Sequence, residues 1–474
     1  MVIRVKTGVD ELDEIIEGGF PKRSLILLVG EPGTGKTVFC MQFLVKGCEL
    51  GESCIYVSFN ESKDTLIENL SRHLNVDLNK FESEGKLKIL DFAAMKEGAI
   101  SIILETILSE VKSLKAERLV IDSFSVMAQA FREAMDVRIV LHTVLNKIVK
   151  QMNCTTLIIE EAPIGESKIG LGIEEFVVDG IIMLKRSELK KRFFRELEVI
   201  KLRGVELKER KLVFTLKNGF KVFPIFKLKP VKPKRFQPIP EQPDKYSTGS
   251  NDLDEILNGG ITKGSIVLFE VDEKVSISEY HLVMAPIAIE FVFQGRGVII
   301  VPSAGVDIEV LKNTSKNYGV TDEEFNSFLR VAEVGIKESE RIYPNIIALK
   351  GKDWREDIYN IMEASKELNA VTNQPNLYII GLDILSAYHG EKACEIILTR
   401  LATRIRKSKA VLLALIKGHK DLATRVMPIA DFHLRILKKH GCLLLYGVKP
   451  RTRLYGVEFD VSKGYPLPKF TAIV

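Results

Sequence analysis

Apolar residues follow two different spacings along this chain. Some runs of strand length are apolar almost throughout, and between them apolar residues recur every three or four positions. The first pattern is typical of strands covered on both faces, and the second of the helices that cover them. In the first half the predicted strands are Ser24–Val29, Cys54–Phe59, Leu87–Leu90, Arg118–Ile121, Thr155–Glu160 and Gly180–Leu184, and the predicted helices are Lys63–Leu74, Ile100–Leu114, Val137–Met152 and Ile173–Val178. This alternation predicts an α/β fold with a mainly parallel central sheet flanked by helices.

The end of the first half has another pattern, because strand-like segments follow one another there without helices between them. These segments are Leu197–Lys201, Val213–Leu216 and Gly219–Phe223. They predict an antiparallel meander that closes one edge of the sheet.

The chain contains an internal repeat. From Thr7–Leu28 to Thr248–Phe269, at a constant offset of 241, 11 of 22 residues are identical without a gap. This predicts a tandem duplication. Pro224 to Lys245 is rich in proline and lysine, which predicts an extended linker rather than a packed element. The expected organisation is therefore a first domain at 1–226, a linker at 227–245 and a second domain at 246–474.

Composition narrows the class of protein. Of 474 residues, 46% are hydrophobic and 28% charged, as in soluble globular proteins, and the net charge of +5 is too small to indicate nucleic-acid binding by itself. We find no secretory signal and no apolar run approaching the ~18 residues that cross a bilayer. The six cysteines form no C-x-x-C pair, and the seven histidines have no metal-site spacing. We therefore expect a cytoplasmic protein with buried, reduced thiols and no membrane contact.

One short segment carries candidate chemistry. Residues 30–37 read G-E-P-G-T-G-K-T and match the phosphate-loop (Walker A) pattern G-x-x-x-x-G-K-[ST], between a predicted strand and a helical pattern. A glycine turn that matches by chance is the alternative, and the flanking strand and helix weaken it. Lys36 would reach the β- and γ-phosphates, and the Thr37 hydroxyl would bind Mg²⁺. The predicted nucleotide-binding residues are Gly30, Glu31, Pro32, Gly33, Thr34, Gly35, Lys36, Thr37 and Val38.

A carboxylate ends one of the predicted strands. Asp122 follows the apolar run Leu119–Ile121, and at the carboxyl end of a central strand it would face the phosphate loop. We expect it to hold Mg²⁺ through water. The alternative is an ordinary turn residue.

These motifs resemble one known family. The repeated Thr-Gly…Leu-Asp-Glu…Gly-Gly, then G-E-P-G-T-G-K-T, Y-V-S-F-N-E-S, L-V-I-D-S, G-I-E-E-F-V-V-D and I-K-L-R-G resemble the KaiC-type branch of RecA-like ATPases, which includes archaeal homologues and the gas-vesicle regulator GvpD. The resemblance covers the whole first copy, and the second more faintly. It implies two tandem RecA-like P-loop domains, ATP with Mg²⁺ at subunit boundaries, and a homo-oligomeric ring that is usually hexameric.

The resemblance also assigns roles near the γ-phosphate. Two acidic residues end the family's second strand, and the first is expected to activate water, whereas this chain has Asn60-Glu61. Asn60 can position a water but cannot accept its proton, so we predict slow hydrolysis, unless Glu61 suffices and Asn60 is only a turn cap. Lys201 and Arg203 match the family's trans-acting finger, with a solvated edge strand as the alternative. Glu160 and Glu161 stand near the expected γ-phosphate sensor.

The second copy lacks these groups. At the same offset, the loop glycines, the lysine and the threonine become Val271, Lys274, Ser276, Ile277 and Ser278. Gly381 stands where Asp122 stands, with Asp383 two residues later. We expect no ATP turnover in this half and no autokinase activity. Lys449-Pro450-Arg451 keeps the finger's spacing, either as a relic or to contact ATP held by a first copy.

Three functions remain open at this stage. The favoured one is a regulatory ATPase whose inert half recruits an unidentified protein partner, with Gly381–Gly390 and Ile405–Lys409 as a candidate surface. A DNA-handling member of the recombinase branch is less favoured. The core begins almost at Met1, and Ala162–Gly170 has little positive charge and no aromatic residue, although basic clusters occur at 190–195 and 404–407. A nucleotide-stabilised scaffold without meaningful turnover is the third.

Overall fold

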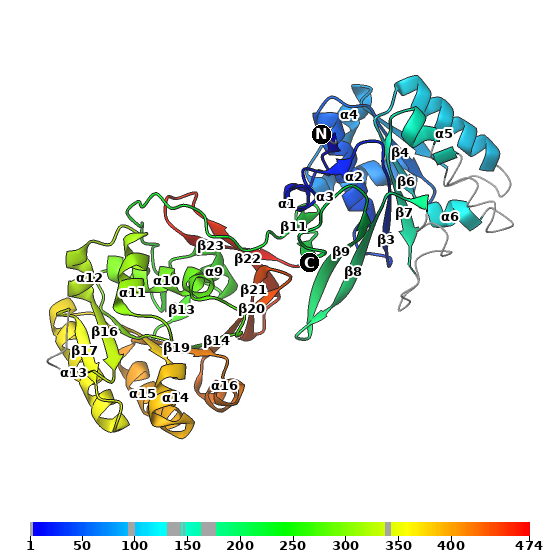
Figure 1. The fold of residues 1–474 in the computed structure, drawn as a ribbon. Helices are drawn as coiled ribbons and strands as arrows, with labels where there is room; N and C mark the ends of the chain where they lie inside the picture. Colours follow the sequence, from blue (N-terminus) through cyan, green and yellow to red (C-terminus); the bar gives the residue numbers. More distant parts are fainter. Residues whose placement is uncertain (1–2, 93–99, 130–143, 146, 163–176, 337–342) are drawn as a thin grey trace. The chain divides into compact units, whose positions relative to one another are not determined.

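We describe the protein from a computed structural model of residues 1–474 (Figure 1). The structure describes residues 3–92, 100–129, 144–145, 147–162, 177–336 and 343–474. The chain forms two compact units, Met1–Pro224 together with Ala472–Val474, and Ile225–Thr471. Each unit is described separately below.

The first unit contains a nine-stranded sheet in the order β11-β10-β9-β8-β3-β7-β6-β4-β5. Its strands are β3 (Leu25–Gly30), β4 (Cys54–Ser58), β5 (Leu87–Asp91), β6 (Arg118–Asp122), β7 (Thr155–Glu161), β8 (Gly180–Leu189), β9 (Arg192–Leu202), β10 (Lys211–Thr215) and β11 (Lys221–Val222). The strands from β8 through β3 to β5 pair in parallel, and β9, β10 and β11 add an antiparallel edge. Both the parallel sheet and the meander confirm the prediction.

Helices cover both faces of this sheet because its central strands are apolar on both faces. In β3, Ile26 and Leu28 belong to one hydrophobic cluster, whereas Leu25, Leu27 and Val29 belong to another. Successive side chains of a strand point to opposite faces, so a fully apolar strand needs two covering layers. The helices are α1 (Asp10–Ile15), α2 (Lys36–Glu49), α3 (Lys63–Leu74), α4 (Leu78–Ser83), α5 (Ile100–Leu114) and α6 (Phe124–Gln129), with a π-helical turn η2 (Lys147–Gln151). The predicted bounds of α3 and α5 are confirmed, whereas most of Val137–Met152 and Ile173–Val178 lies outside the described residues.

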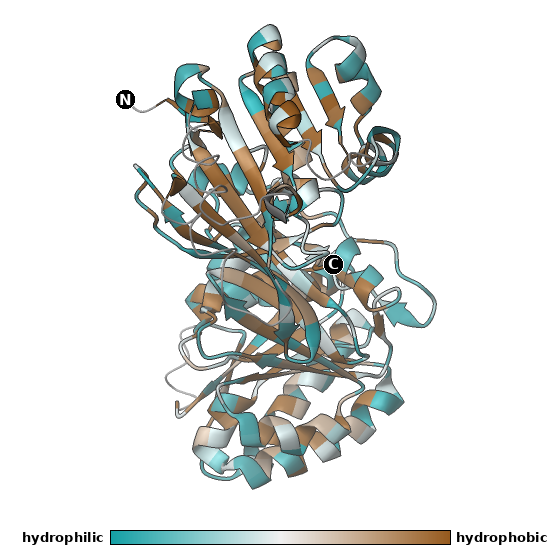
Figure 2. Ribbon diagram, turned by 90° about the vertical axis from the view of Figure 1, so that its right-hand side faces the viewer, coloured by the Kyte–Doolittle hydropathy of each residue, from teal (hydrophilic) through white to brown (hydrophobic). Residues whose placement is uncertain are grey.

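The second unit has the same layered design around a ten-stranded sheet, in the order β17-β16-β15-β18-β19-β14-β20-β21-β22-β23. Its strands are β14 (Ile266–Val271), β15 (Val298–Val301), β16 (Leu329–Val334), β17 (Ile346–Leu349), β18 (Leu377–Gly381), β19 (Val411–Lys417), β20 (Phe432–Lys439), β21 (Cys442–Lys449), β22 (Leu454–Asp460) and β23 (Leu467–Ala472). Its helices are α9 (Asn251–Ile256), α10 (Ile277–Phe293), α11 (Ile308–Lys316), α12 (Asp322–Phe328), α13 (Trp354–Thr372), α14 (Leu382–His389), α15 (Glu391–Ser408) and α16 (Lys420–Val426). Figure 2 shows apolar strands between helices with one apolar and one polar side. Two mainly parallel sheets flanked by helices confirm the predicted fold class.

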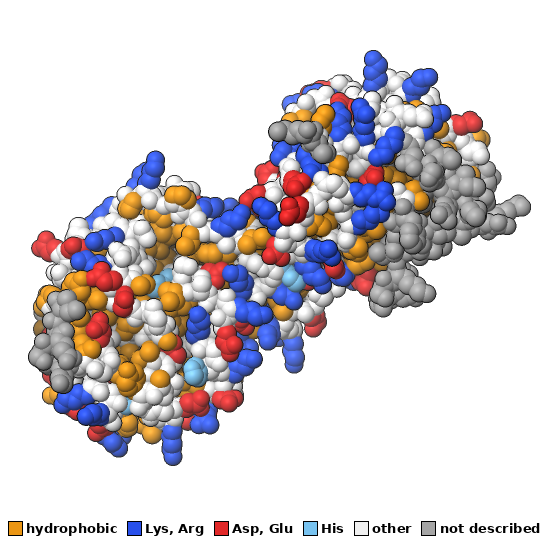
Figure 3. Space-filling view, viewed as in Figure 1, with side chains coloured by type: hydrophobic (Ala, Val, Ile, Leu, Met, Phe, Trp, Pro, Cys, Tyr) orange, Lys and Arg blue, Asp and Glu red, His pale blue; other side chains and the backbone are white. Residues whose placement is uncertain are grey.

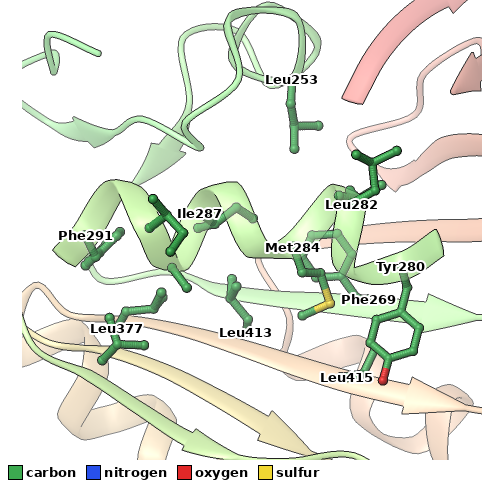
Figure 4. Packing of buried hydrophobic residues seen from close by; sticks show 14 of the residues in the cluster. Leu253, Phe269, Tyr280, Leu282, Met284, Ile287, Phe291, Leu377, Leu413 and Leu415 are labelled. Carbon is green, nitrogen blue, oxygen red and sulfur yellow. The ribbon is translucent and has the colours of Figure 1, made fainter. Parts of the chain in front are cut away.

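Helix α10 supplies one side of the second core. Figure 4 shows its Met284, Ile287 and Phe291 packed over Leu377 of β18 and Leu413 of β19. Each of these side chains is at most 4% exposed, and full burial of a side chain of this size stabilises the fold by about 1.5–3 kcal/mol.

The repeated segment has the same structural role in both units. In each, a two-stranded sheet (β1, Arg4–Val5, with β2, Phe20–Pro21; and β12, Lys245–Tyr246, with β13, Ile261–Thr262) flanks the short helix α1 or α9. Gly19 and Gly260 have φ values of +132° and +107°, and a Cβ there would lie 2.2 Å from the Val5 carbonyl oxygen or 2.3 Å from that of Tyr246. Only glycine fits such a position, which explains why both copies retain it.

The proline-rich segment differs from the prediction in one respect. It has no regular secondary structure between Pro224 and Asp244, as its composition predicts. It is nevertheless packed, because Phe236 is 2% exposed within the second unit's core and its amide donates to the Tyr318 carbonyl. The expectation of an unpacked linker was wrong, since one buried aromatic side chain outweighs the surrounding proline and lysine.

All six cysteines are buried, which confirms the predicted burial of the thiols. Among the described residues, none of the helices has the length and hydrophobicity needed to cross a bilayer.

Candidate nucleotide site

The Walker A segment connects the carboxyl end of β3 to the first turn of α2. Gly33 and Gly35 adopt left-handed φ values of +76° and +102°, which glycine adopts without strain. A Cβ on Gly30 would lie 2.7 Å from the Leu184 carbonyl oxygen. Each glycine of the motif therefore meets a backbone requirement, and the loop leads into a helix amino end that attracts anions.

Lys36 lies beneath this loop. It is 7% exposed, and its ammonium group donates to the carbonyl oxygens of Gly30 at 2.7 Å and Glu31 at 3.0 Å. Burial lowers the pKa of Lys36, while the nearby carboxylates of Glu161 and Asp122 oppose that change. The cation is thus held in the loop where a bound phosphate would lie.

Asp122 and Thr37 are in direct contact. The Thr37 hydroxyl donates to Asp122 Oδ2 at 2.8 Å, and the Tyr56 hydroxyl donates to the same oxygen. Parallel pairing of β4 with β6 sets Tyr56 opposite Val120, two residues before Asp122. Burial and the Asp122 carboxylate raise the pKa of Tyr56 well above its usual value, so Tyr56 remains a proton donor. The structure thus brings together the two predicted magnesium ligands and adds a tyrosine that sequence reasoning missed.

Two glutamates end the neighbouring strand β7. Glu161 pairs with Gly30 and Glu160 with Val29, so both lie beside the start of the loop. Glu160 is 5% exposed, whereas Glu161 is exposed and close enough to Lys36 to affect its pKa. Of the two, Glu161 is therefore the one that faces the loop lysine.

Asn60 and Glu61 follow β4, and both side chains are exposed. The Ser58 hydroxyl donates to the Glu61 carbonyl at 2.6 Å and accepts from the Glu61 amide at 3.2 Å, which holds this turn. Because β4 runs parallel to β3, with β7 and β6 between them, the turn lies at the same carboxyl edge of the sheet as the Walker A loop.

Lys201 and Arg203 lie at the opposite end of the strands. Gly30 pairs with Leu184 of β8, but Lys201 pairs with Ile181, three residues nearer the amino end of β8 or about 10 Å away. The Lys201 ammonium donates to the Val178 carbonyl at 2.8 Å, and the half-exposed Arg203 lies 3.7 Å from Asp179. These two side chains are therefore directed away from the loop of their own chain.

Arg195 of β9 is a further residue at the loop that the sequence did not indicate. Its Nη1 donates to the Gly33 and Thr34 carbonyl oxygens, each at 3.1 Å, and its Nε donates to the Val474 carbonyl. The side chain is 8% exposed, and burial together with Arg186 lowers its pKa to about 10. Arg195 therefore fastens the tip of the Walker A loop.

Comparison with known proteins identifies the family to which this chain belongs. The family described as "ATPase: KaiC" matches residues 5–227, and "GvpD basic region 2" matches residues 235–333. A UPF0273 protein of Pyrococcus furiosus is 32% identical over 239 residues, which are 47% of this chain and 95% of that protein. The chain belongs to the KaiC family of ATPases.

Other relatives match about half of this KaiC-family chain. The circadian clock oscillator protein KaiC of Synechococcus elongatus is 32% identical over 281 residues, 56% of this chain and 52% of that protein, so the chain spans about half the length of the clock proteins it matches. A KaiC-like protein of Pyrococcus horikoshii of known structure is 37% identical, with a TM-score of 0.43, and the match covers 47% of this chain and all of that one.

In the second unit of this KaiC-family chain, side chains of the unit itself occupy the start of α10, the position that corresponds to the Walker A loop and the start of α2. Ser276 precedes α10, and the Glu279 carboxylate accepts from the Ser276 amide at 2.7 Å and its hydroxyl at 2.9 Å. Lys438 donates to the other Glu279 oxygen at 2.7 Å, and Glu279 is 2% exposed. A carboxylate of the chain thus occupies the helix start that receives phosphate in a working loop.

The second unit also differs at the position that corresponds to Asp122. Gly381 pairs with Leu415 at the end of β18, and a Cβ there would lie 2.7 Å from the Pro302 carbonyl oxygen. Asp383 instead accepts hydrogen bonds from Ser303 and from the Ala304 amide. Lys449 donates to the Ala430 carbonyl at 2.6 Å, as Lys201 donates to Val178 in the first unit. Lys449 and Lys201 therefore make equivalent backbone contacts in the two units.

Proposed function

We propose that the amino-terminal unit binds MgATP and hydrolyses it slowly, as a regulatory switch within a ring of identical chains. The contact between Thr37 and Asp122 beside Lys36 carries this proposal, because it unites a hydroxyl, a carboxylate and an ammonium group below a glycine loop. Hydroxyl and carboxylate oxygens are hard ligands that suit Mg²⁺. Thr37 would bind the ion directly and Asp122 through water, and the ion would neutralise charge on the phosphates.

Nucleotide binding is tested by equilibrium dialysis of the full chain with ATP. We expect one ATP per chain, lost in Lys36→Ala and retained in Ile277→Ala, which alters the equivalent position of the second unit. Retention in Lys36→Ala with loss in Ile277→Ala would overturn the assignment.

Catalysis is proposed to need two chains. Lys201 and Arg203 lie about 10 Å along the strand from the level of their own loop, so they suit the γ-phosphate of a neighbouring chain. There they would offset charge that develops in the transition state. A hexameric ring satisfies this arrangement for every copy.

Mixing two inactive variants tests the shared site. Arg203→Ala should bind ATP without hydrolysing it, and Lys36→Ala should provide Arg203 without binding ATP. When the two are co-expressed with different tags and purified together, activity should exceed that of either alone. Activity in pure Arg203→Ala, or none in the co-purified mixture, would contradict a trans-acting Arg203.

The slow rate is proposed to follow from Asn60, whose amide cannot accept a proton near neutral pH. Asn60→Glu should raise the turnover number, whereas Asn60→Gln, which changes length but not basicity, should not. An unchanged rate in Asn60→Glu would show that Glu61 suffices.

The second unit is proposed to be non-catalytic, without autokinase activity, and to bind a protein partner through α14 and the end of α15. The self-capping of Ser276 by Glu279 and the glycine at 381 support this role. DNA handling has less support, because the face in Figure 3 shows Lys and Arg spread among acidic and neutral side chains within each unit. A salt-dependent DNA titration distinguishes the two, since DNA handling requires tight binding that weakens steeply with salt.

A further inference from the structure

The second unit contains an apolar cavity that is separate from the inert loop. It lies between α10, β15 and α11 and has a volume of about 60 Å³, several times the roughly 10–15 Å³ that one water needs. Its walls are mainly apolar, and Met284, Ala285 and Ala288 belong to this part of the lining. The polar lining residues are Tyr280, His281, Ser303, Thr314 and Ser315.

At the cavity, α10 has a smaller side chain than its counterpart in the first unit. At the repeat's constant offset, Ala285 corresponds to Leu44 of α2, which is fully buried in the first unit's core. Replacing a leucine by alanine removes three carbons, and the surrounding core closes such a gap only in part. Met284 and Ala288 of α10 and Ile300 of β15 line the space that remains.

One wall carries a hydrogen-bond donor that is not well satisfied. Tyr280 is 1% exposed, and its hydroxyl makes no hydrogen bond of normal geometry among the described residues, although Ser303 lies close enough to affect its pKa. The neighbouring Ser303 hydroxyl donates to Asp383 instead. Leaving a buried hydroxyl unpaired is costly, so a ligand that accepts from Tyr280 gains the bond at little cost.

The groups next to the Tyr280 hydroxyl disfavour binding of an anion. Burial raises the pKa of Tyr280 to about 12, with Asp383 adding to the effect, so the hydroxyl stays protonated. Burial also lowers the pKa of His281 to about 4, which leaves its imidazole neutral. A carboxylate ligand would meet the Asp383 charge without a cation on the wall to offset it.

We propose that this cavity binds a small, neutral, mainly apolar molecule whose carbonyl oxygen or ring nitrogen accepts a hydrogen bond from Tyr280. The second unit has thus lost its phosphate loop and has gained a site of different chemistry on the other side of α10's first turns. This inference does not depend on ATP binding by the first unit.

Three probes of nearly equal shape test the proposal on the full chain. Acetone is neutral and has one carbonyl, isobutene replaces that oxygen by CH₂, and acetate is the corresponding anion; each has four heavy atoms, which suits a cavity of about 60 Å³. Binding is measured by saturation-transfer NMR titration. Acetone should bind about two- to tenfold more tightly than isobutene, the range of one net hydrogen bond, and acetate should bind most weakly. Equal or tighter binding of acetate, or no binding of any probe, would overturn the proposal.

Variants localise the site. Ala285→Leu, which restores the residue found in the first unit, should abolish acetone binding, and Ala288→Val does so independently if the first variant fails to fold. Tyr280→Phe should reduce acetone affinity to that of isobutene without lowering thermal stability, which a merely structural tyrosine would not allow. Lys36→Ala, the control at the nucleotide site, should bind acetone unchanged. Unaltered binding in both Ala285→Leu and Ala288→Val would refute this location.

Discussion

Arg195 connects the Walker A loop to the antiparallel edge of the sheet, and its removal should weaken ATP binding without direct contact to the nucleotide. Arg195→Met keeps the apolar part of the side chain beside Phe193, whose ring lies 4.8 Å from the guanidinium, but deletes the bonds to the Gly33 and Thr34 carbonyls. Two such bonds contribute about 1–3 kcal/mol net. If the loop must regain its shape on binding, Kd for ATP should rise roughly 5- to 150-fold.

The assay is a titration with a fluorescent ATP analogue in the presence of Mg²⁺. Arg195→Lys, which keeps the charge but cannot bridge two carbonyls with one planar group, should fall between wild type and Arg195→Met. Arg192→Met, on the same strand but away from the loop, is the matched control and should bind normally. An Arg195→Met affinity within twofold of wild type would refute the reasoning, since the loop would then hold its shape unaided.

Three further outcomes are expected. Asp122→Asn should raise the Mg²⁺ concentration needed for ATP binding at least tenfold, measured by titrating the metal at fixed nucleotide, and an unchanged requirement would remove Asp122 from the metal site. Burial raises the pKa of Glu290 to about 7 from 4.5, so the folded second unit keeps a proton that the unfolded chain releases. Its unfolding free energy should therefore fall by up to about 3 kcal/mol as pH rises from about 4.5 to 7, and stay level above. Glu290→Gln should remove that slope in urea melts followed by the single tryptophan, Trp354, and a slope equal to wild type would contradict the assignment. Arg451→Glu should leave the ATPase rate unchanged if the second finger is a relic, and a large loss would show that it contacts ATP.

Sequence patterns predicted correctly those elements that are determined by residues close together in the sequence. The bounds of α3 and α5 followed from helical spacing, and Lys36, Thr37 and Asp122 followed from a strand, a glycine loop and a helix in sequence. Strand β8 was predicted to end at Leu184 but continues to Leu189, because polar residues such as Lys185 pair across the hairpin with Glu198 rather than with the core. A search for apolar runs does not detect strand residues whose side chains are polar and exposed to solvent.

The missed residues depend on distant contacts. Arg195 meets the loop across more than 160 positions, and Tyr56 meets Asp122 across 66, so neither has a signature in its own neighbourhood. Tyr56 could have been suspected from its alternation with Ser58 on a strand beside Asp122. The cavity in the second unit is lined by residues from several elements, so it too has no signature in a local pattern.

Because every cysteine side chain is buried, the reaction of the thiols with a labelling reagent reports local unfolding of the protein. Four cysteines (Cys40, Cys48, Cys54 and Cys154) belong to the first unit and two (Cys394 and Cys442) to the second. A maleimide or disulfide reagent can react only when the enclosing structure transiently opens. Saturating ATP should therefore slow alkylation of the first four by the factor 1 + [ATP]/Kd, while the other two continue at their original pace. Mass spectrometry of a single labelled sample would thus measure the opening rate of each unit separately, from the labelling of its own cysteines.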